Sequence, residues 1–312
     1  MRRAALLWSV FLALALACGE EPDERPGGST RVESSAPAPR PKPVLATPAV
    51  EPNPLGLPFK RLEVPEGTPI YAPPLAMLRG ARLGTAMQLR ATTVAGKDGD
   101  LLLVDGGEDP DFLLHPGYVV VHTPGSRTPR LNQPVLTSFG GLLRHGVVKS
   151  FIRSKVVVRF TDVLSQPERQ LDAAVLMAQA DGLAPGNYAA LKIQDGYEHV
   201  LLVSRIEGAP SAPNGPVPSK TAAPKSENDR WLVIGYGGAT AIVAAAELAL
   251  IPVTYEPKVG AAVWAEHLGR MRRGVVAEVD KPSVFAVRFE RAGSPVNVGW
   301  GGLMPPMVVQ PR

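Results

Sequence analysis

One order of short elements recurs along this chain of 312 residues, and the recurrence limits the possible folds more than any other feature. Each copy has an apolar strand, a loop, a second strand with paired aliphatic residues, a turn, and a β-branched third strand that ends in an aromatic residue. Short strands at regular spacing, separated by Gly and Asp turns, are typical of small antiparallel barrels and not of parallel sheets with helices. We therefore expect an all-β protein built from tandem small barrels.

Three of the copies can be aligned because they have similar residues at several equivalent positions. The paired aliphatic residues are Val147-Val148, Leu201-Leu202 and Val275-Val276. The third strands close with Val158-Arg159-Phe160, Ile234-Gly235-Tyr236 and Val287-Arg288-Phe289. This alignment predicts that Phe160, Tyr236 and Phe289 occupy one core position. It also places His145 and His199 in one column, which indicates a structural position on a strand or hairpin.

A fourth, more divergent copy precedes these three. Asp98-Gly99 stands between two apolar runs and predicts a hairpin turn there. The expected barrels span residues 59–122, 131–179, 183–256 and 257–309. The third contains an insertion at 208–228 that is rich in Pro, Ala and Ser, which predicts a disordered surface loop. The Pro spacing in this insertion leaves a docking segment open as an alternative.

The N-terminal segment predicts export and a lipid anchor. Residues 1–17 have a basic start, an apolar run and small residues before Cys18, the only cysteine of the chain. This pattern resembles a bacterial lipoprotein signal peptide, in which the Cys18 thiol takes a diacylglyceryl group; ordinary secretory cleavage after Ala17 is the alternative. Gly19 follows Cys18 where Asp would signal retention in the inner membrane. We expect a lipid-anchored protein of the cell envelope, at the outer membrane.

Residues 18–58 are expected to form a disordered tether. The segment is dominated by Pro, Ala, Ser and mixed charges and has no aromatic residue, so it offers too little apolar area to offset the entropy of ordering. The formal charge is +4, and loss of Arg2 and Arg3 with the signal peptide leaves +2. This near balance, without a basic run after export, argues against a nucleic-acid partner.

The last copy carries the clearest family resemblance. Its motifs are Val263-Trp264-Ala265, Arg272-Arg273-Gly274-Val275-Val276, Val287-Arg288-Phe289 and Leu303-Met304-Pro305. They resemble the Tudor/Agenet branch of SH3-like barrels, while the first copy, with His115-Pro116-Gly117-Tyr118-Val119, is similar to bacterial SH3 domains of envelope proteins. The D-Y-G turn of the Tudor family is absent. The resemblance implies ligand binding in grooves between loops or between adjacent barrels.

Candidate binding residues follow from this resemblance and from the basic hairpin of the last copy. They are Trp264, Arg272, Arg273, Trp300, Tyr188 and Tyr197. The aromatic side chains are those that a binding groove or cation–π pocket would use. The arginines are placed to meet anionic envelope polymers, although Arg and Lys on strand edges also protect against edge pairing.

Catalytic and metal-binding patterns are scarce in this sequence. The five histidines do not form a spaced zinc pair, and there is no G-x-S-x-G motif and no thiol besides that of Cys18. We expect no cofactor, no metal and no enzymatic activity. The leading hypothesis is a non-catalytic protein, anchored to the membrane by its lipid, whose barrels bind an envelope protein or peptidoglycan.

Two other readings stay open. One is a purely structural spacer, whose sign is deep packing between barrels without an open groove. The other is an enzyme of unrecognised type with a polar cluster that draws on Asp162, Glu247 or His199. The oligomeric state does not follow from the sequence.

Overall fold

The alternation of apolar and polar residues predicts strands, and strands dominate the described chain. The computed structural model describes residues 50–58, 63–80, 88–123, 129–165, 167–179, 182–206, 229–290 and 293–306. By its internal contacts the chain divides into residues 1–44 and 45–312, and every described residue belongs to the second unit. The all-β prediction is confirmed. The predicted signal peptide, Cys18, most of the predicted tether and the insertion at 208–228 lie outside the described residues.

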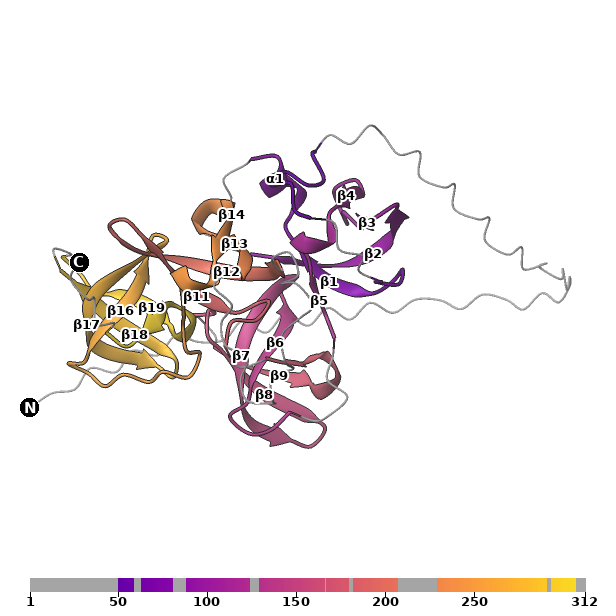
Figure 1. The fold of residues 1–312 in the computed structure, drawn as a ribbon. Coiled ribbons are helices and arrows are strands. Elements are labelled where there is room, and N and C mark those ends of the chain that lie inside the picture. Colours follow the sequence, from indigo (N-terminus) through magenta and orange to yellow (C-terminus); the bar gives the residue numbers. More distant parts are fainter. Residues whose placement is uncertain are drawn as a thin grey trace, which may run out of the picture. The chain divides into compact units, whose positions relative to one another are not determined.

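The twenty strands of the described residues fall into four consecutive modules of five (Figure 1). Module 1 contains β1 (Pro69–Ala72), β2 (Arg90–Asp98), β3 (Leu101–Val104), β4 (Phe112–Leu114) and β5 (Val120–Val121). Module 2 contains β6 (Pro134–Phe139), β7 (Leu142–Ile152), β8 (Lys155–Phe160), β9 (Glu168–Asp172) and β10 (Met177–Ala178). Module 3 contains β11 (Tyr188–Ile193), β12 (Gly196–Ile206), β13 (Arg230–Ile234), β14 (Thr240–Ala244) and β15 (Leu248–Leu250). Module 4 contains β16 (Ala262–His267), β17 (Arg270–Lys281), β18 (Val284–Phe289), β19 (Val296–Gly299) and β20 (Leu303–Met304).

Helical structure is limited to short turns. A 3₁₀ turn precedes the last strand of each module: η1 (Pro116–Tyr118), η2 (Ala173–Val175), η4 (Ala245–Glu247) and η5 (Trp300–Gly302). Module 1 also has α1 (Leu75–Leu78), and module 3 has η3 (Tyr236–Gly238). Among the described residues, no helix has the length and apolar character needed to cross a membrane.

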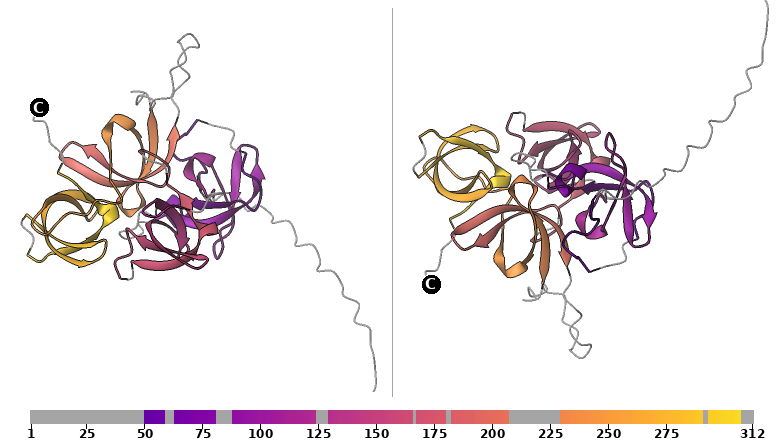
Figure 2. Two further views of the ribbon diagram at one scale, coloured as in Figure 1. Left: turned by 90° about the horizontal axis from the view of Figure 1, so that it is seen from below. Right: turned by 90° about the horizontal axis from the view of Figure 1, so that it is seen from above.

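The four modules share one antiparallel strand order. In each, the last strand pairs with the first, and the first four pair in sequence, as in β10-β6-β7-β8-β9 of module 2. The strands curl strongly, and module 4, drawn in yellow, closes into a ring in both views of Figure 2. The predicted hairpin at Asp98-Gly99 is present: β2 ends at Asp98, and Gly99 has a φ of 59°.

A shared β-bulge aligns the modules residue by residue. In the second strand of each module the register shifts after Val94, Val148, Leu202 or Val276. The carbonyl oxygens of these residues accept hydrogen bonds from the amides of Gly67, Asn132, Gly186 and Gly260. All four donors have positive φ, a conformation that Gly and Asn tolerate best, so the sequence allows the same turn in each module.

Modules 2, 3 and 4 build their cores from equivalent positions. Five of these columns are Val135/Ala189/Val263, Val148/Leu202/Val276, Val156/Trp231/Phe285, Val158/Val233/Val287 and Leu176/Leu248/Leu303. The predicted core position of Phe160 and Phe289 is correct, since both are buried. The prediction for Tyr236 is wrong. Val147 pairs with Arg159 and Leu201 pairs with Ile234, so Gly235 is the equivalent of Phe160, and Tyr236 lies 39% exposed in η3.

Neighbouring modules are joined in pairs by the same strand contact. The start of β2 pairs with the start of β7, at Arg90 and Leu142. The start of β12 pairs with the start of β17, at Glu198 and Arg270, which are the equivalent positions in the second pair. The described chain therefore contains two ten-stranded sheets, each shared by two modules.

The two pairs also contact one another through 3₁₀ turns. The Ser204 hydroxyl of β12 donates to the Gly117 carbonyl of η1 at 2.6 Å. The Gly301 amide of η5 donates to the Thr161 carbonyl of module 2 at 3.2 Å. Just before η5, a Cβ on Gly299 would lie 2.1 Å from the Thr161 carbonyl oxygen, so only glycine allows this approach. Modules 1 and 3, and likewise modules 2 and 4, thus meet through residues that lie far apart in the sequence.

Candidate functional site

Three of the six predicted binding residues lie together at the junction of modules 3 and 4. The Trp264 ring on β16 meets the Tyr197 ring on β12 edge to face, with centroids 5.5 Å apart. The Arg273 guanidinium on β17 lies 5.4 Å from the centroid of the Trp264 ring. Arg273 is the register partner of Trp264, so the β16–β17 hairpin itself brings the cation to the ring.

The other three predicted residues are placed differently. Arg272 is exposed on β17, beside Arg273. Trp300 is fully buried in η5, where Lys149 and Arg159 of module 2 each lie 5.8 Å from its ring centroid. Tyr188 is buried between two histidine rings. These two aromatic side chains therefore form contacts between modules and do not line an open aromatic cage.

A polar cleft of about 440 Å³ opens where modules 2, 3 and 4 meet. We call it the junction cleft. Its charged and polar side chains include Arg144, Asp162, His199, Glu266 and His267. Tyr188 also lines it, and Tyr236 and Leu268 stand at its border. Carboxylate, guanidinium, imidazole and hydroxyl groups thus share one opening, which suits a polar ligand with hydrogen-bonding groups.

An ion pair with little solvent exposure lies in the wall of the junction cleft. Arg144 Nη1 donates to Asp162 Oδ2 at 2.7 Å, and each side chain is 17% exposed. Burial raises the pKa of Asp162, and the positive charge of Arg144 opposes this shift. Asp162 Oδ1 is buried and makes no hydrogen bond with any described residue. A ligand donor that reached this oxygen would satisfy a buried acceptor.

A stack of three rings forms the floor beside this ion pair. The Tyr188 ring lies 4.4 Å from that of His145 and 4.8 Å from that of His199. His199 Nε2 is 2.8 Å from the Gly301 carbonyl oxygen, so this nitrogen is the donor. Burial lowers the pKa of His145 to about 3 and also lowers that of His199, with Glu266 opposing the second shift. Both imidazoles therefore favour the neutral form at pH 7.

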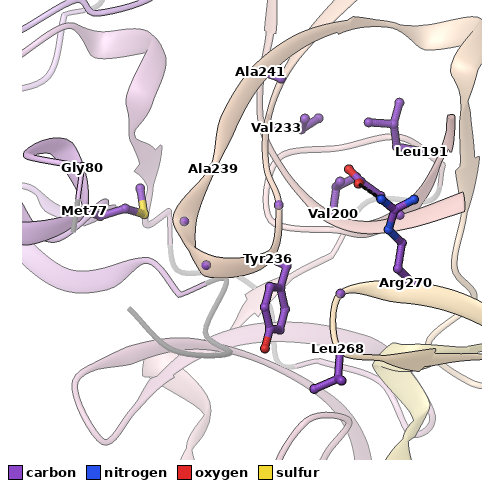
Figure 3. A pocket seen from close by; sticks show the side chains of 15 residues that line it. Met77, Gly80, Leu191, Val200, Val233, Tyr236, Ala239, Ala241, Leu268 and Arg270 are labelled. Carbon is purple, nitrogen blue, oxygen red and sulfur yellow. Dashed lines mark ion pairs between the residues drawn. The ribbon is translucent and has the colours of Figure 1, made fainter. Parts of the chain in front are cut away.

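A second, more apolar cavity of about 550 Å³ opens into one end of module 3. Figure 3 shows the side chains of Leu191, Val200 and Val233 inside the curl of this module. Glu198 and Arg270 form an ion pair of 3.4 Å at its rim. We call this cavity the module 3 pocket.

The described residues contain no group of three or more His, Cys, Asp or Glu side chains that could hold a metal ion. Of the residues named for an enzyme, Asp162 and His199 line the junction cleft, whereas Glu247 caps η4 by accepting from the Ala244 amide at 3.0 Å.

In comparisons with known proteins, no family model and no curated protein matches the sequence.

Sequence reasoning missed Glu266 as a member of the junction cleft, and it did not foresee the ion pair between Arg144 and Asp162. That ion pair depends on the exact register of β7 and β8, which the sequence does not show. Glu266 enters the cleft only through the packing of module 4 against module 3. No local motif marks either contact.

Proposed function

We propose that this chain is a lipid-anchored, non-catalytic binding protein of the cell envelope, whose four SH3-like modules hold a cell-wall polymer or an envelope protein at the junction cleft. The observation that carries the proposal is the cleft itself: modules 2, 3 and 4 together present opposite charges, imidazoles and phenols around one opening. Grooves between adjacent barrels are where barrels of the type it resembles bind ligands.

Peptidoglycan is the favoured ligand class. It offers hydroxyl, amide, carboxylate and amine groups in a repeating array, which matches the mixed polarity of the cleft. The exposed residues Arg272 and Arg273 of β17 add positive charge next to the junction of modules 3 and 4, where they would meet carboxylates of the polymer.

A purely structural spacer is the second candidate, and a specific observation favours it. Leu201, Leu232 and Ile234 of module 3 are fully buried in one cluster with Leu57 and Tyr118 of module 1. Such packing between modules suits a rigid spacer. The spacer hypothesis also predicts the absence of an open groove, however, and the junction cleft is open.

Co-sedimentation with purified peptidoglycan sacculi tests the proposal. We expect residues 45–312 to pellet with sacculi and to stay bound as salt is raised, because a ligand held in a cleft is screened less than one on an open surface. The double variant Arg272→Glu/Arg273→Glu, which tests the exposed arginines outside the lining of the junction cleft, should reduce the pelleted fraction by half or more at low salt.

Arg230→Glu is the matched control, since it reverses one exposed arginine at the start of β13 and should leave pelleting unchanged. Protein that stays in the supernatant at every salt concentration would exclude the cell wall as ligand. Crosslinking of the anchored chain in cells would then address envelope proteins as partners.

A further inference from the structure

Module 3 lacks the aromatic side chain that fills one end of modules 2 and 4. In those modules Phe160 and Phe289 occupy equivalent core positions, opposite Gly146 and Gly274 on the second strand. Module 3 has Gly235 at the phenylalanine position. Val200, which stands at the position of the two opposing glycines, fills only part of the space of a phenyl ring.

The surrounding positions are also less filled in module 3. The Phe139 ring covers Phe160 with centroids 5.0 Å apart, and the His267 ring covers Phe289 at 5.1 Å. The equivalent position in module 3 is Ile193, which has no ring. On the neighbouring strand, module 2 has Arg169 and module 4 has Val296. The equivalent residue of module 3 is the smaller Ala241. At each of these equivalent positions module 3 has a side chain without a ring or a smaller side chain, so the same end of the module stays open.

The space left open is the module 3 pocket. Its volume of about 550 Å³ lies in the range of small-ligand sites, roughly 300–1,000 Å³. Its interior is aliphatic, and its rim carries the Glu198–Arg270 ion pair and Tyr236 (Figure 3). An apolar interior with a few polar groups at the mouth is the usual composition of a ligand site.

Glycine at this position does not by itself produce a pocket. Module 1 has Gly106 at the equivalent position, and there a Cβ would lie 2.3 Å from the carbonyl oxygens of Asp109 and Pro110. The backbone therefore fills that end of module 1, where the remaining cavity is only about 10 Å³. At Gly235 the nearest atom to a Cβ is the Ala239 carbonyl oxygen at 3.7 Å, an ordinary contact.

We propose that the module 3 pocket binds an aromatic side chain presented by a partner polypeptide, which takes the place that Phe160 and Phe289 hold in modules 2 and 4. The ring would pack on the half-buried Leu191 and above Val200 and Val233, which are each 1% exposed and form the bottom of the pocket, and the backbone of the partner would lie at the polar rim. The insertion that joins β12 to β13, residues 207–228, contains no aromatic residue and cannot supply the ring from within the same module. This site adjoins the junction cleft, with which it shares Tyr236 and Leu268, but the proposed aromatic ligand does not depend on the peptidoglycan contact.

The probe for this site is N-acetyl-phenylalanine amide, titrated into the purified chain with isotope-labelled methyl groups and followed by NMR. We expect saturable shifts at the methyl groups of Leu191, Val200 and Val233. N-acetyl-alanine amide should produce no saturable shift at these groups. In Gly235→Phe the new ring should fill the pocket, weaken probe binding at least tenfold and raise the melting temperature by about 2–4 °C.

Two further variants complete the test. Gly293→Phe is the matched control, because nothing lies within 4 Å of a Cβ at that position and it should bind the probe normally. Gly235→Ala adds only one methyl group and should retain most of the probe binding. Probe binding to this variant can be measured even where Gly235→Phe fails to fold. The proposal is wrong if the wild-type chain shows no saturable shift, if the alanine probe binds equally well, or if a folded Gly235→Phe binds like the wild type.

Discussion

Replacing Trp300 with alanine is expected to lower the free energy of unfolding by about 3–5 kcal/mol. The Trp300 ring is 1% exposed and lies in one buried cluster with Val298, Leu303 and the module 2 residue Val147. Alanine leaves a cavity inside module 4 and also removes the ring that faces Lys149 and Arg159. The loss therefore affects the core of one module and its contact with another.

Urea unfolding of the wild type and the variant, followed by circular dichroism, measures this effect. Val259→Ala is the control, because Val259 is 61% exposed and its truncation should change the free energy of unfolding by less than about 0.5 kcal/mol. A loss of under 1 kcal/mol in Trp300→Ala would contradict the tight packing of η5 against module 2.

Acid is expected to destabilise the folded chain through His145. Burial lowers the pKa of His145 from its ordinary 6.5 to about 3; the Gly186 backbone opposes this shift, and His199 and Arg144 add to it. Between these two pH values the unfolded chain binds a proton that the folded chain does not, so stability falls as pH falls below 6.5. The contribution is about 1.4 kcal/mol per pH unit in that window.

The measurement is the free energy of unfolding at pH 7, 6, 5 and 4 in the wild type and in His145→Asn. Asp162 lies nearby, and its raised pKa gives a contribution of opposite sign, so the difference in slope between the two proteins is the informative quantity. We expect the slope to be smaller in His145→Asn by roughly 1 kcal/mol per pH unit. Equal slopes would show that His145 is not held in its neutral form by burial.

The strand content and the repeated order of elements could be predicted because both depend on local patterns. Alternating residues such as those of Val156 to Phe160 specify strands, and the Asp98-Gly99 turn specifies a hairpin. The paired aliphatic columns were also aligned correctly, since the β-bulge follows Val148, Leu202 and Val276 in turn.

The alignment of the third strand was wrong by one residue in module 3, and the reason is physical. Aromatic residues were matched to each other, so Tyr236 was aligned with Phe160. The backbone pairing instead aligns Phe160 with Gly235, a residue type with nothing to mark it as a core position. The module 3 pocket arises from this missing side chain, and an alignment by residue type conceals it.

The junction cleft depends on contacts that local patterns do not encode. His199 meets Gly301 across 102 positions of sequence, and Ser283 donates to the Phe160 carbonyl across 123. Trp300 and Tyr188 were selected as binding residues because they are aromatic; Trp300 is fully buried, whereas Tyr188 contacts two histidine rings and also lines the junction cleft. Only the packing of whole modules distinguishes a ligand-facing ring from one that holds two modules together.

The cross-contacts between the two pairs have a consequence for the order in which the chain can mature. The buried face around Tyr118 is completed by Leu232 and Ile234, which are synthesised much later, and module 2 receives Trp300 later still. A growing chain that stops after β10 would expose apolar surfaces that have no cover yet. Such a nascent chain would benefit from a chaperone until module 4 is made, and truncation within module 4 would harm modules that were translated first.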